Sequence, residues 1–240
     1  MSYVASITDS DVFSAVRDWL LSVLGGAGFT GTIVGDVLTV ASVLGSVEVG
    51  QLLRGEGVPS GVTVAAPGAL PNTYQLSSSV GSFGGVKMTT GIEVVQGIVN
   101  RVPSPAGGFV LITRISKVRL STDVTEYTDP LHGPSSVEYL QSTDYQLQFD
   151  FFGEDAADWA QVVSTLWRSL QACDFLKPYG IQPLYNDDPR QVPMVTGEKQ
   201  YEQRWVMTTH LNYTPKVSVP QDFFDVVDVG VISIDATYAP

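Results

Sequence analysis

Four basic residues lie close together and form the one concentration of positive charge in the sequence: Arg101, Arg114, Lys117 and Arg119. Lys117 and Arg119 would share one face of a strand, because side chains alternate between the two faces with a period of two. Two interpretations stay open. The strip pairs with acidic residues of the same or a neighbouring subunit, or it faces DNA or an acidic partner in the channel of an assembly.

Residues with catalytic or metal-binding potential are few and scattered. The two histidines are His132 and His210, and the single cysteine is Cys173. None of them lies at a spacing typical of a metal site, and Cys173 follows an apolar helical pattern that favours a buried, inert thiol. Asp187 and Asp188 lie in a proline-rich segment, where acids commonly cap turns. The sequence therefore predicts no enzyme, no metal site and no cofactor.

The run Gly26-Ala27-Gly28-Phe29-Thr30-Gly31 matches the glycine pattern of dinucleotide-binding loops. That function requires a strand before the glycines and a helix after them. Here a helical pattern comes first and a β-rich segment follows. We interpret the glycines as a flexible junction between two parts of the chain.

Composition excludes several other classes of protein. The net charge is −12, from 13 basic and 25 acidic residues, whereas nonspecific nucleic-acid binding depends on lysine and arginine neutralising phosphates. One cysteine allows no intrachain disulfide and favours assembly in the cytoplasm. Residues 1–11 are polar and acidic, so we expect no signal peptide, and no apolar stretch is long enough to span a bilayer.

Two helices are expected. Thr8 and Asp11 have the spacing of a capping box, and apolar residues follow at intervals of three and four until Gly25. A second helix with a continuous apolar face is expected between Gly153 and Leu170. Both stripes follow the period of an amphipathic helix packed against a core.

Residues 29–90 have a different character. They carry only five charged residues and combine short β-branched runs with glycine-rich turns. This pattern predicts a small all-β domain with tight turns. We interpret it as an insertion into a domain formed by residues 1–28 and 91–240.

Outside the insertion the pattern favours an α+β domain, with a mainly antiparallel sheet flanked by the two helices. Residues 121–143 and 177–193 are interpreted as a long polar loop and a proline-rich loop, and residues 222–240 as a final strand with an extended arm. The expected strands cover residues 94–102, 109–120, 145–151 and 200–213.

Contacts with partners are expected in the polar loop and in the arm at 229–240. Extended polar segments with few means of internal packing usually gain order from a partner. The candidate contact residues there are Tyr127, His132, Tyr139 and Tyr238.

Several separate segments outside the insertion resemble one protein family. They are Val94-Val95-Gln96-Gly97, Asn100-Arg101-Val102-Pro103, Leu120-Ser121-Thr122, residues 148–153, residues 183–191 and residues 197–205. These segments resemble the neck or tail-terminator proteins of long-tailed bacteriophages. The resemblance covers residues 1–25 and about 92–240.

The resemblance implies a structural virion protein whose α+β subunits form a closed ring, typically six-fold. Such a ring caps the tail tube and joins the tail to head-completion or connector proteins, with sheath proteins as further neighbours. DNA passes through the channel without sequence-specific binding, and no membrane is involved. The insertion is absent from the simplest members and resembles β modules of other virion proteins, so we expect it to decorate the ring. The alternative is another structural part: a head-closure, collar or tail tube protein.

Overall fold

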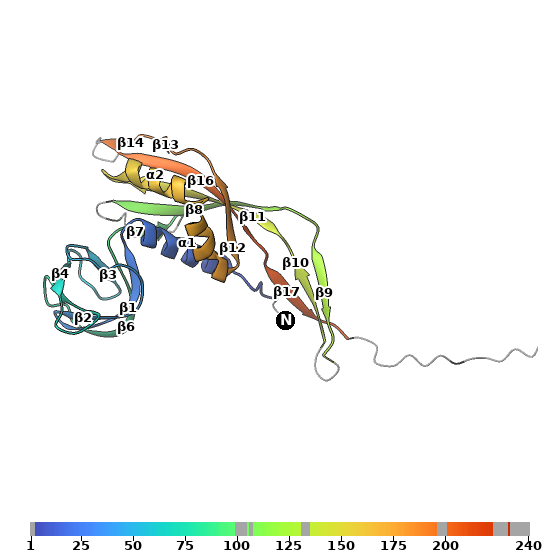
Figure 1. Ribbon diagram of the computed structural model, residues 1–240, viewed down its shortest axis with the longest axis horizontal. Coiled ribbons are helices and arrows are strands. Elements are labelled where there is room, and N and C mark those ends of the chain that lie inside the picture. The colour runs from blue at the N-terminus through green and yellow to red at the C-terminus, as the bar shows by residue number, and fades with distance from the viewer. Residues whose placement is uncertain are drawn as a thin grey trace, which may run out of the picture.

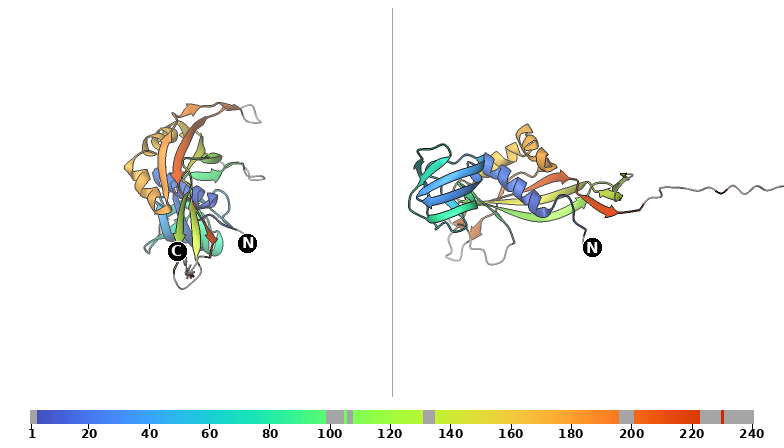
Figure 2. Two further views of the ribbon diagram at one scale, coloured as in Figure 1. Left: turned by 90° about the vertical axis from the view of Figure 1, so that its right-hand side faces the viewer. Right: turned by 90° about the horizontal axis from the view of Figure 1, so that it is seen from below.

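The computed structural model describes residues 3–98, 105, 108–130, 135–195, 201–222 and 230. The described elements form an elongated molecule (Figures 1 and 2). A six-stranded sheet lies at one end, a second sheet with three helices lies in the middle, and a small three-stranded sheet lies at the other end.

The sheet at the first end, the β1–β6 sheet, is antiparallel throughout and has the order β3-β6-β1-β2-β5-β4. It encloses an apolar core of its own that includes Phe29, Ile33 and Leu38. Residues 27–90 contain no helix, which confirms the all-β prediction. The strands are β1 (Ala27–Gly35), β2 (Val37–Gly45), β3 (Leu53–Gly55), β4 (Val64–Pro67), β5 (Thr73–Leu76) and β6 (Gly81–Thr90).

The ends of this sheet meet at a glycine junction. β1 and β6 pair with each other from Ala27 opposite Thr90 onward. Gly91 has a φ of +77°, and a Cβ there would lie 2.6 Å from the carbonyl oxygen of Gly25. Only glycine fits such a position without a clash. The glycine run thus follows a helix and begins a strand, the reverse of the order that a dinucleotide site needs.

The middle sheet, called the core sheet below, has the order β12-β16-β11-β8-β7, and β13 also pairs with β16. Its pairs are antiparallel except for β7 with β8, so the α+β prediction with a mainly antiparallel sheet is confirmed. Its strands are β7 (Glu93–Gln96), β8 (Phe109–Arg119), β11 (Thr143–Phe152), β12 (Ile181–Asn186), β13 (Arg190–Gln191) and β16 (Arg204–Tyr213).

Three helices pack together on one face of the core sheet: α1 (Asp9–Val23), α2 (Ala156–Leu166) and α3 (Leu170–Leu176). Trp19 of α1 meets Trp167 edge to face at 5.2 Å between ring centroids, and Trp167 meets Phe149 of β11 at 5.7 Å. Alternate residues of β11 and β16 fill this side, as the period-two pattern predicted. They are Tyr145, Leu147, Phe149 and Phe151 on β11 and Trp205, Met207, Leu211 and Tyr213 on β16.

The prediction of a single helix from Gly153 to Leu170 is wrong. α2 ends at Leu166, and α3 starts separately, capped by Ser169, whose side chain accepts a hydrogen bond from the backbone N–H of Ala172. The break leaves the side chain of Leu170 75% exposed, outside the expected apolar face. Serine is a favoured N-cap residue, so Ser169 stabilises the start of a new helix rather than the continuation of α2.

The two predicted loops are also wrong in part. Residues 121–143 contain β9 (Val124–Thr128) and β10 (Ser136–Leu140). With β17 (Lys216–Pro220) they form the distal sheet, in the order β17-β10-β9. Residues 177–193 contain a short 3₁₀ helix, η1 (Lys177–Tyr179), and strands β12 and β13. β12 is an edge strand of the core sheet, and proline is tolerated on edge strands because its missing N–H need not pair with a neighbouring strand.

A two-stranded ribbon of β14 (Met194–Val195) and β15 (Tyr201–Glu202) completes the described elements. Most of the expected C-terminal arm lies outside the described residues. None of the helices in the described part of the chain has the length and apolar character needed to cross a membrane.

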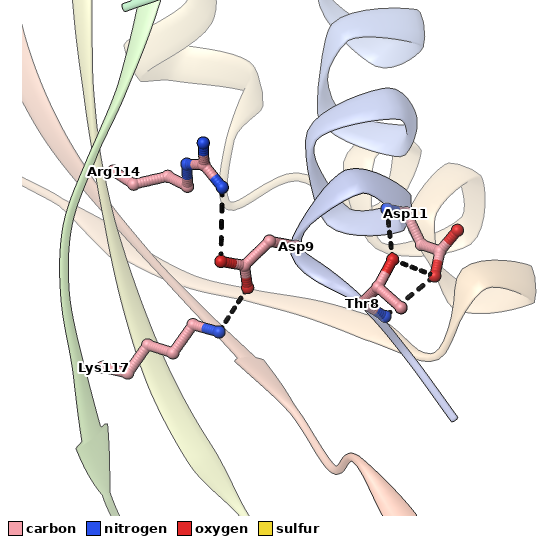
Figure 3. Close-up of polar contacts among 5 residues, drawn as sticks. All are labelled: Thr8, Asp9, Asp11, Arg114 and Lys117. Atoms are coloured by element: carbon pink, nitrogen blue, oxygen red, sulfur yellow. Dashed lines mark hydrogen bonds and ion pairs between the residues drawn. The ribbon is translucent and has the colours of Figure 1, made fainter. Parts of the chain in front are cut away.

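The predicted start of α1 is confirmed and allows a test. Thr8 Oγ1 accepts a hydrogen bond from the Asp11 N–H at 3.3 Å, and Asp11 Oδ2 accepts one from the Thr8 N–H at 2.8 Å (Figure 3). Thr8→Ala is expected to lower the free energy of unfolding by about 1 kcal/mol, measured by urea denaturation. Ser10→Ala on the same helical turn is the control, and an equal loss in both variants would contradict the capping assignment.

The same cap should respond to acid. The hydrogen bonds from the Thr8 side chain and backbone hold the pKa of Asp11 below its ordinary value of 3.8. The stability that they contribute is therefore present above that value and is lost as pH falls through the lowered pKa. The difference between Thr8→Ala and the unchanged protein should shrink over that acidic range.

Candidate functional site

The basic residues of the predicted strip lie on β8, and a β-bulge decides which way they face. The pairing with β11 shifts between Gln146, opposite Ser116, and Leu147, opposite Arg114. Ile115 is the extra residue, and its side chain is 49% exposed. A bulge changes the alternation of the strand, so Arg114 joins Lys117 on the face that carries the helices.

Arg114 and Lys117 both contact Asp9 in the first turn of α1 (Figure 3). Arg114 Nη1 lies 3.3 Å from Asp9 Oδ2, and Lys117 Nζ contacts Asp9 Oδ1. An acid in the first turn also suits the positive end of the helix dipole. These two cations therefore fix the start of α1 against β8.

Lys117 is held further by aromatic rings. Its Nζ lies 4.8 Å from the ring centre of Tyr145 and 5.7 Å from that of Tyr213. Burial alone would lower the pKa of Lys117, but its interactions with Asp9 and Tyr213 outweigh burial and raise that pKa. The lysine is thus charged over the whole physiological range.

Arg119 lies at the exposed end of β8, where the core sheet meets the distal sheet. It lines a groove of about 750 Å³ together with Asp9, Lys117, Tyr139 and Val217. The groove therefore contains two residues of the basic strip and one of the predicted tyrosine contacts. Its charges are mixed rather than purely basic.

The remaining candidate contacts divide into two groups. Tyr127 of β9 and Tyr139 of β10 are exposed on the distal sheet. Arg101, His132 and Tyr238 lie outside the described residues.

The other face of the core sheet carries buried polar groups, among them His210 and the acids Asp144 and Asp150. Asp150 of β11 is 1% exposed and accepts hydrogen bonds from Arg204 of β16 at 2.6 and 2.9 Å. His210 Nδ1 lies 2.9 Å from Asp144 Oδ2, and its ring stacks on Tyr185 with centroids 4.1 Å apart. The available signal was Asp144 and Asp150 on the polar face of the alternating strand β11, since buried charges require partners.

These groups do not form a recognisable catalytic centre. Among the described residues, no three histidine, cysteine, aspartate or glutamate side chains are grouped as a metal site would require. Asp187 and Asp188 are exposed between β12 and β13. The thiol of Cys173 accepts a hydrogen bond from Gln182 Nε2 at 3.1 Å.

The pKa of Tyr145, whose ring lies against Lys117 of the basic strip, can be tested by spectroscopy. Burial, assisted by the Asp9 carboxylate, raises the pKa of Tyr145 from 10.0 to about 12. The folded protein therefore holds this proton to higher pH than the unfolded chain does. The contribution of Tyr145 to the free energy of unfolding is constant below pH 10 and falls as pH rises from about 10 to about 12. Ultraviolet titration should show one tyrosine ionising last.

Tyr145→Phe should remove that last component of the titration and leave the others in place. Tyr127→Phe, at an exposed tyrosine, serves as the control and should leave the last component in place. A last component that survives Tyr145→Phe would contradict the assignment.

Comparison with known proteins identifies the family. A search of curated proteins returned no match to the chain. A family model described as phage neck terminator protein matches residues 75–235. The matched residues contain every strand of the core sheet, the three strands of the distal sheet, and the helices α2 and α3. Helix α1 lies before the match. The chain therefore belongs to the phage neck terminator protein family, a structural family of the virion.

Proposed function

We propose that this neck terminator protein forms a closed ring of six subunits that caps the tail tube and joins it to head-completion proteins. Family membership supports the location in the neck. The observation that carries the ring is the distal sheet, which extends away from the core at one end of the molecule (Figure 1). Such a projection has little to pack against within its own subunit.

Exposed apolar side chains gather on this projection and on the end of β8 that leads to it. Soluble monomers rarely expose apolar residues together unless they contact a partner. Head-to-tail contacts between copies use two different patches of the same subunit and can close into a ring. The exposed residues are Val118, Leu120, Val124, Tyr127 and Tyr139.

The proposal extends to the partners and to the passage of DNA. The tail tube, and sheath proteins where present, would contact one side of the ring, and head-completion or connector proteins the other. The net charge of −12 favours a channel through which DNA passes without being held. Arg119, Tyr127 and Tyr139 are proposed contact residues. Assembly in the host cytoplasm and a purely structural, non-enzymatic role complete the proposal.

The test is the mass of the purified protein by native mass spectrometry across a concentration range, with negative-stain images of the same sample. A species of six subunits seen as single rings would support the proposal. Open-ended tubes would refute it in favour of a tail tube protein. A monomer that forms no ring even when tail tube ends are added would also refute it.

We also propose that residues 29–90 are an inserted domain that decorates the ring. Support comes from the separate apolar core of the β1–β6 sheet and from the glycine junction where its ends meet. Loop-closure entropy changes little with such an insertion. A variant in which Gly28 is joined directly to Gly91 is expected to keep the core fold and still form rings. Loss of rings in a folded variant would contradict this role.

A further inference from the structure

β9 is an open edge of the distal sheet. All five of its residues are exposed, and it is the last strand in the order β17-β10-β9. In the part of the chain that the structure describes, β10 is the one strand that pairs with it. The outer edge of such a strand is a template for pairing with another chain.

The opposite edge of the same sheet is already covered by the chain itself. Ala5 forms a bridge to Val217 of β17. The Ser6 N–H donates to the Lys216 carbonyl oxygen at 2.9 Å, and the Lys216 N–H donates to Ser6 Oγ at 2.9 Å. The N-terminal segment thus protects β17, whereas β9 has no equivalent cover among the described residues.

The surface beside β9 suits an apolar strand. Val118 and Leu120 at the end of β8, Val124 of β9 and Tyr139 of β10 are each between 43% and 56% exposed. In β-augmentation the main chain supplies the hydrogen bonds, and alternate side chains of the added strand settle on the neighbouring surface. Val124 on β9 itself and Tyr139 on its partner strand β10 provide part of that surface, one on each face of the distal sheet.

The C-terminal segment has the composition of such a strand. Residues 223–240 are 18 residues rich in valine and isoleucine, with no lysine or arginine and a single proline at the last position. β-Branched residues favour strands, and they recur here at Val227, Val229, Val231 and Ile234. Fully extended, 18 residues could reach roughly 60 Å. This length exceeds what pairing with β9 requires.

We propose that residues 223–240 of one copy add a strand to β9 of the next copy in the ring. This inference rests on the proposed ring. The segment leaves the distal sheet from β17 at one edge, while the acceptor is at the other edge. Each copy can therefore donate at one edge and accept at the other, as a head-to-tail interface requires.

Charge predicts how this contact responds to salt. The donor segment carries Asp225, Asp228 and Asp235 and no basic residue, and the acceptor strand carries Glu126. Lys216 Nζ, 3.5 Å from Glu126, neutralises part of the acceptor charge. Because acids meet acids, the contact relies on main-chain bonds and apolar burial. Ring formation should therefore become tighter as ionic strength screens the repulsion.

Cross-linking between two variants tests the contact directly. In a full-length Cys173→Ser background, one variant carries Thr125→Cys in β9 and the other carries Ser233→Cys in the C-terminal segment. A short bismaleimide should give cross-linked dimers in the mixture and little in either variant alone. Ser79→Cys, at an exposed position between β5 and β6, replaces Thr125→Cys as the control and should give none.

The double variant with Thr125→Cys and Ser233→Cys in one chain separates two geometries. Pairing between copies should give a ladder of cross-linked multimers. A monomer that runs as an internally cross-linked loop would mean that the segment folds back on its own β9, and the inference would be wrong.

Charged substitutions then connect the contact to the ring. Val124→Asp and Val231→Asp should each raise the concentration needed for ring formation by about tenfold or more, because an aspartate would be desolvated in the interface. Val34→Asp, at an exposed valine in a strand of the β1–β6 sheet, should leave that concentration unchanged. Thermal unfolding of each variant checks that the fold is intact.

The outcomes distinguish this inference from the proposed function. Rings in the unchanged protein, without cross-links and without an effect of Val124→Asp or Val231→Asp, would overturn the inference and leave the ring proposal standing. Absence of rings in the unchanged protein under every condition, with tail tube ends included, would overturn both.

Discussion

Trp167→Ala is expected to lower the free energy of unfolding by about 3–5 kcal/mol. The Trp167 ring is fully buried and packs edge to face against Trp19 and Phe149, which belong to a different helix and to the sheet. Its indole N–H also donates to the carbonyl oxygen of His210 at 3.1 Å. Removal would leave a cavity where α1, α2 and β11 meet. Urea denaturation followed by circular dichroism measures the loss.

Two variants make this result specific. Trp159→Ala removes a half-buried tryptophan from the same helix and should cost clearly less. Trp167→Phe keeps most of the packing but leaves the His210 carbonyl without its donor, so an intermediate loss of about 1–3 kcal/mol is expected. Equal losses in Trp159→Ala and Trp167→Ala would show that burial at the helix junction is not the dominant cause.

Arg204→Met is expected to lower the free energy of unfolding by about 3–5 kcal/mol. The Asp150 carboxylate is 1% exposed, and Arg204 supplies two of its hydrogen bonds. Without the guanidinium, the buried carboxylate keeps, among the described side chains, the amide of Gln148 at 2.9 and 3.1 Å. An uncompensated charge away from water is costly, and denaturation at neutral pH would measure that cost.

The reverse change should be milder. Asp150→Asn leaves Arg204 without its acid, but the Arg204 side chain is 28% exposed and can be hydrated. The double variant Asp150→Asn with Arg204→Met should recover part of the loss, since no buried charge remains. Lys216→Met, which breaks exposed ion pairs with Glu126 and Glu138, is the matched control and should destabilise the protein far less than Arg204→Met. A double variant as unstable as the sum of its parts would contradict the pairing argument.

The structure separates the parts of this chain that hold the fold from those available to neighbours. The helix-covered face of the core sheet is filled by aromatic and aliphatic side chains. Arg114 and Lys117 pair with Asp9 of the same subunit, which agrees with the first of the two interpretations of the basic strip. Several exposed apolar side chains, among them Val124, Tyr127 and Tyr139, lie on the distal sheet at the far end of the molecule. Neighbour contacts are therefore expected on the distal sheet and at Arg119 beside it, rather than at Arg114 and Lys117.

Several elements could be predicted from the sequence because the interactions that form them join residues only a few positions apart. The capping box of Thr8 and Asp11 and the apolar stripe after it specify α1, since each contact joins residues three or four positions apart. The alternation in β11 and β16 predicted their buried face, because strands with one covered side need apolar residues at every second position. The β-rich composition of residues 29–90 likewise predicted a sheet without helices.

Other features depend on contacts between distant residues and could not be read in this way. β9 buries none of its residues, so burial imposes no alternation on its sequence, and it looked like part of a loop. Arg114 reached the face of Lys117 through a bulge that exists only where β8 pairs with β11. Its partner Asp9 lies 105 positions earlier in the chain. Asp144 and His210 meet across 66 positions.

The physical reason for this division is the range of the interactions. Helix caps and apolar periodicity act over a few residues and leave a mark in the neighbouring sequence. Bulges, strand edges and ion pairs across a sheet are decided by which strands lie side by side, and pairing depends on the whole chain. The family and the main elements of this protein were thus evident from sequence patterns, whereas the open edge of β9 and the partners of the basic strip came from its tertiary structure.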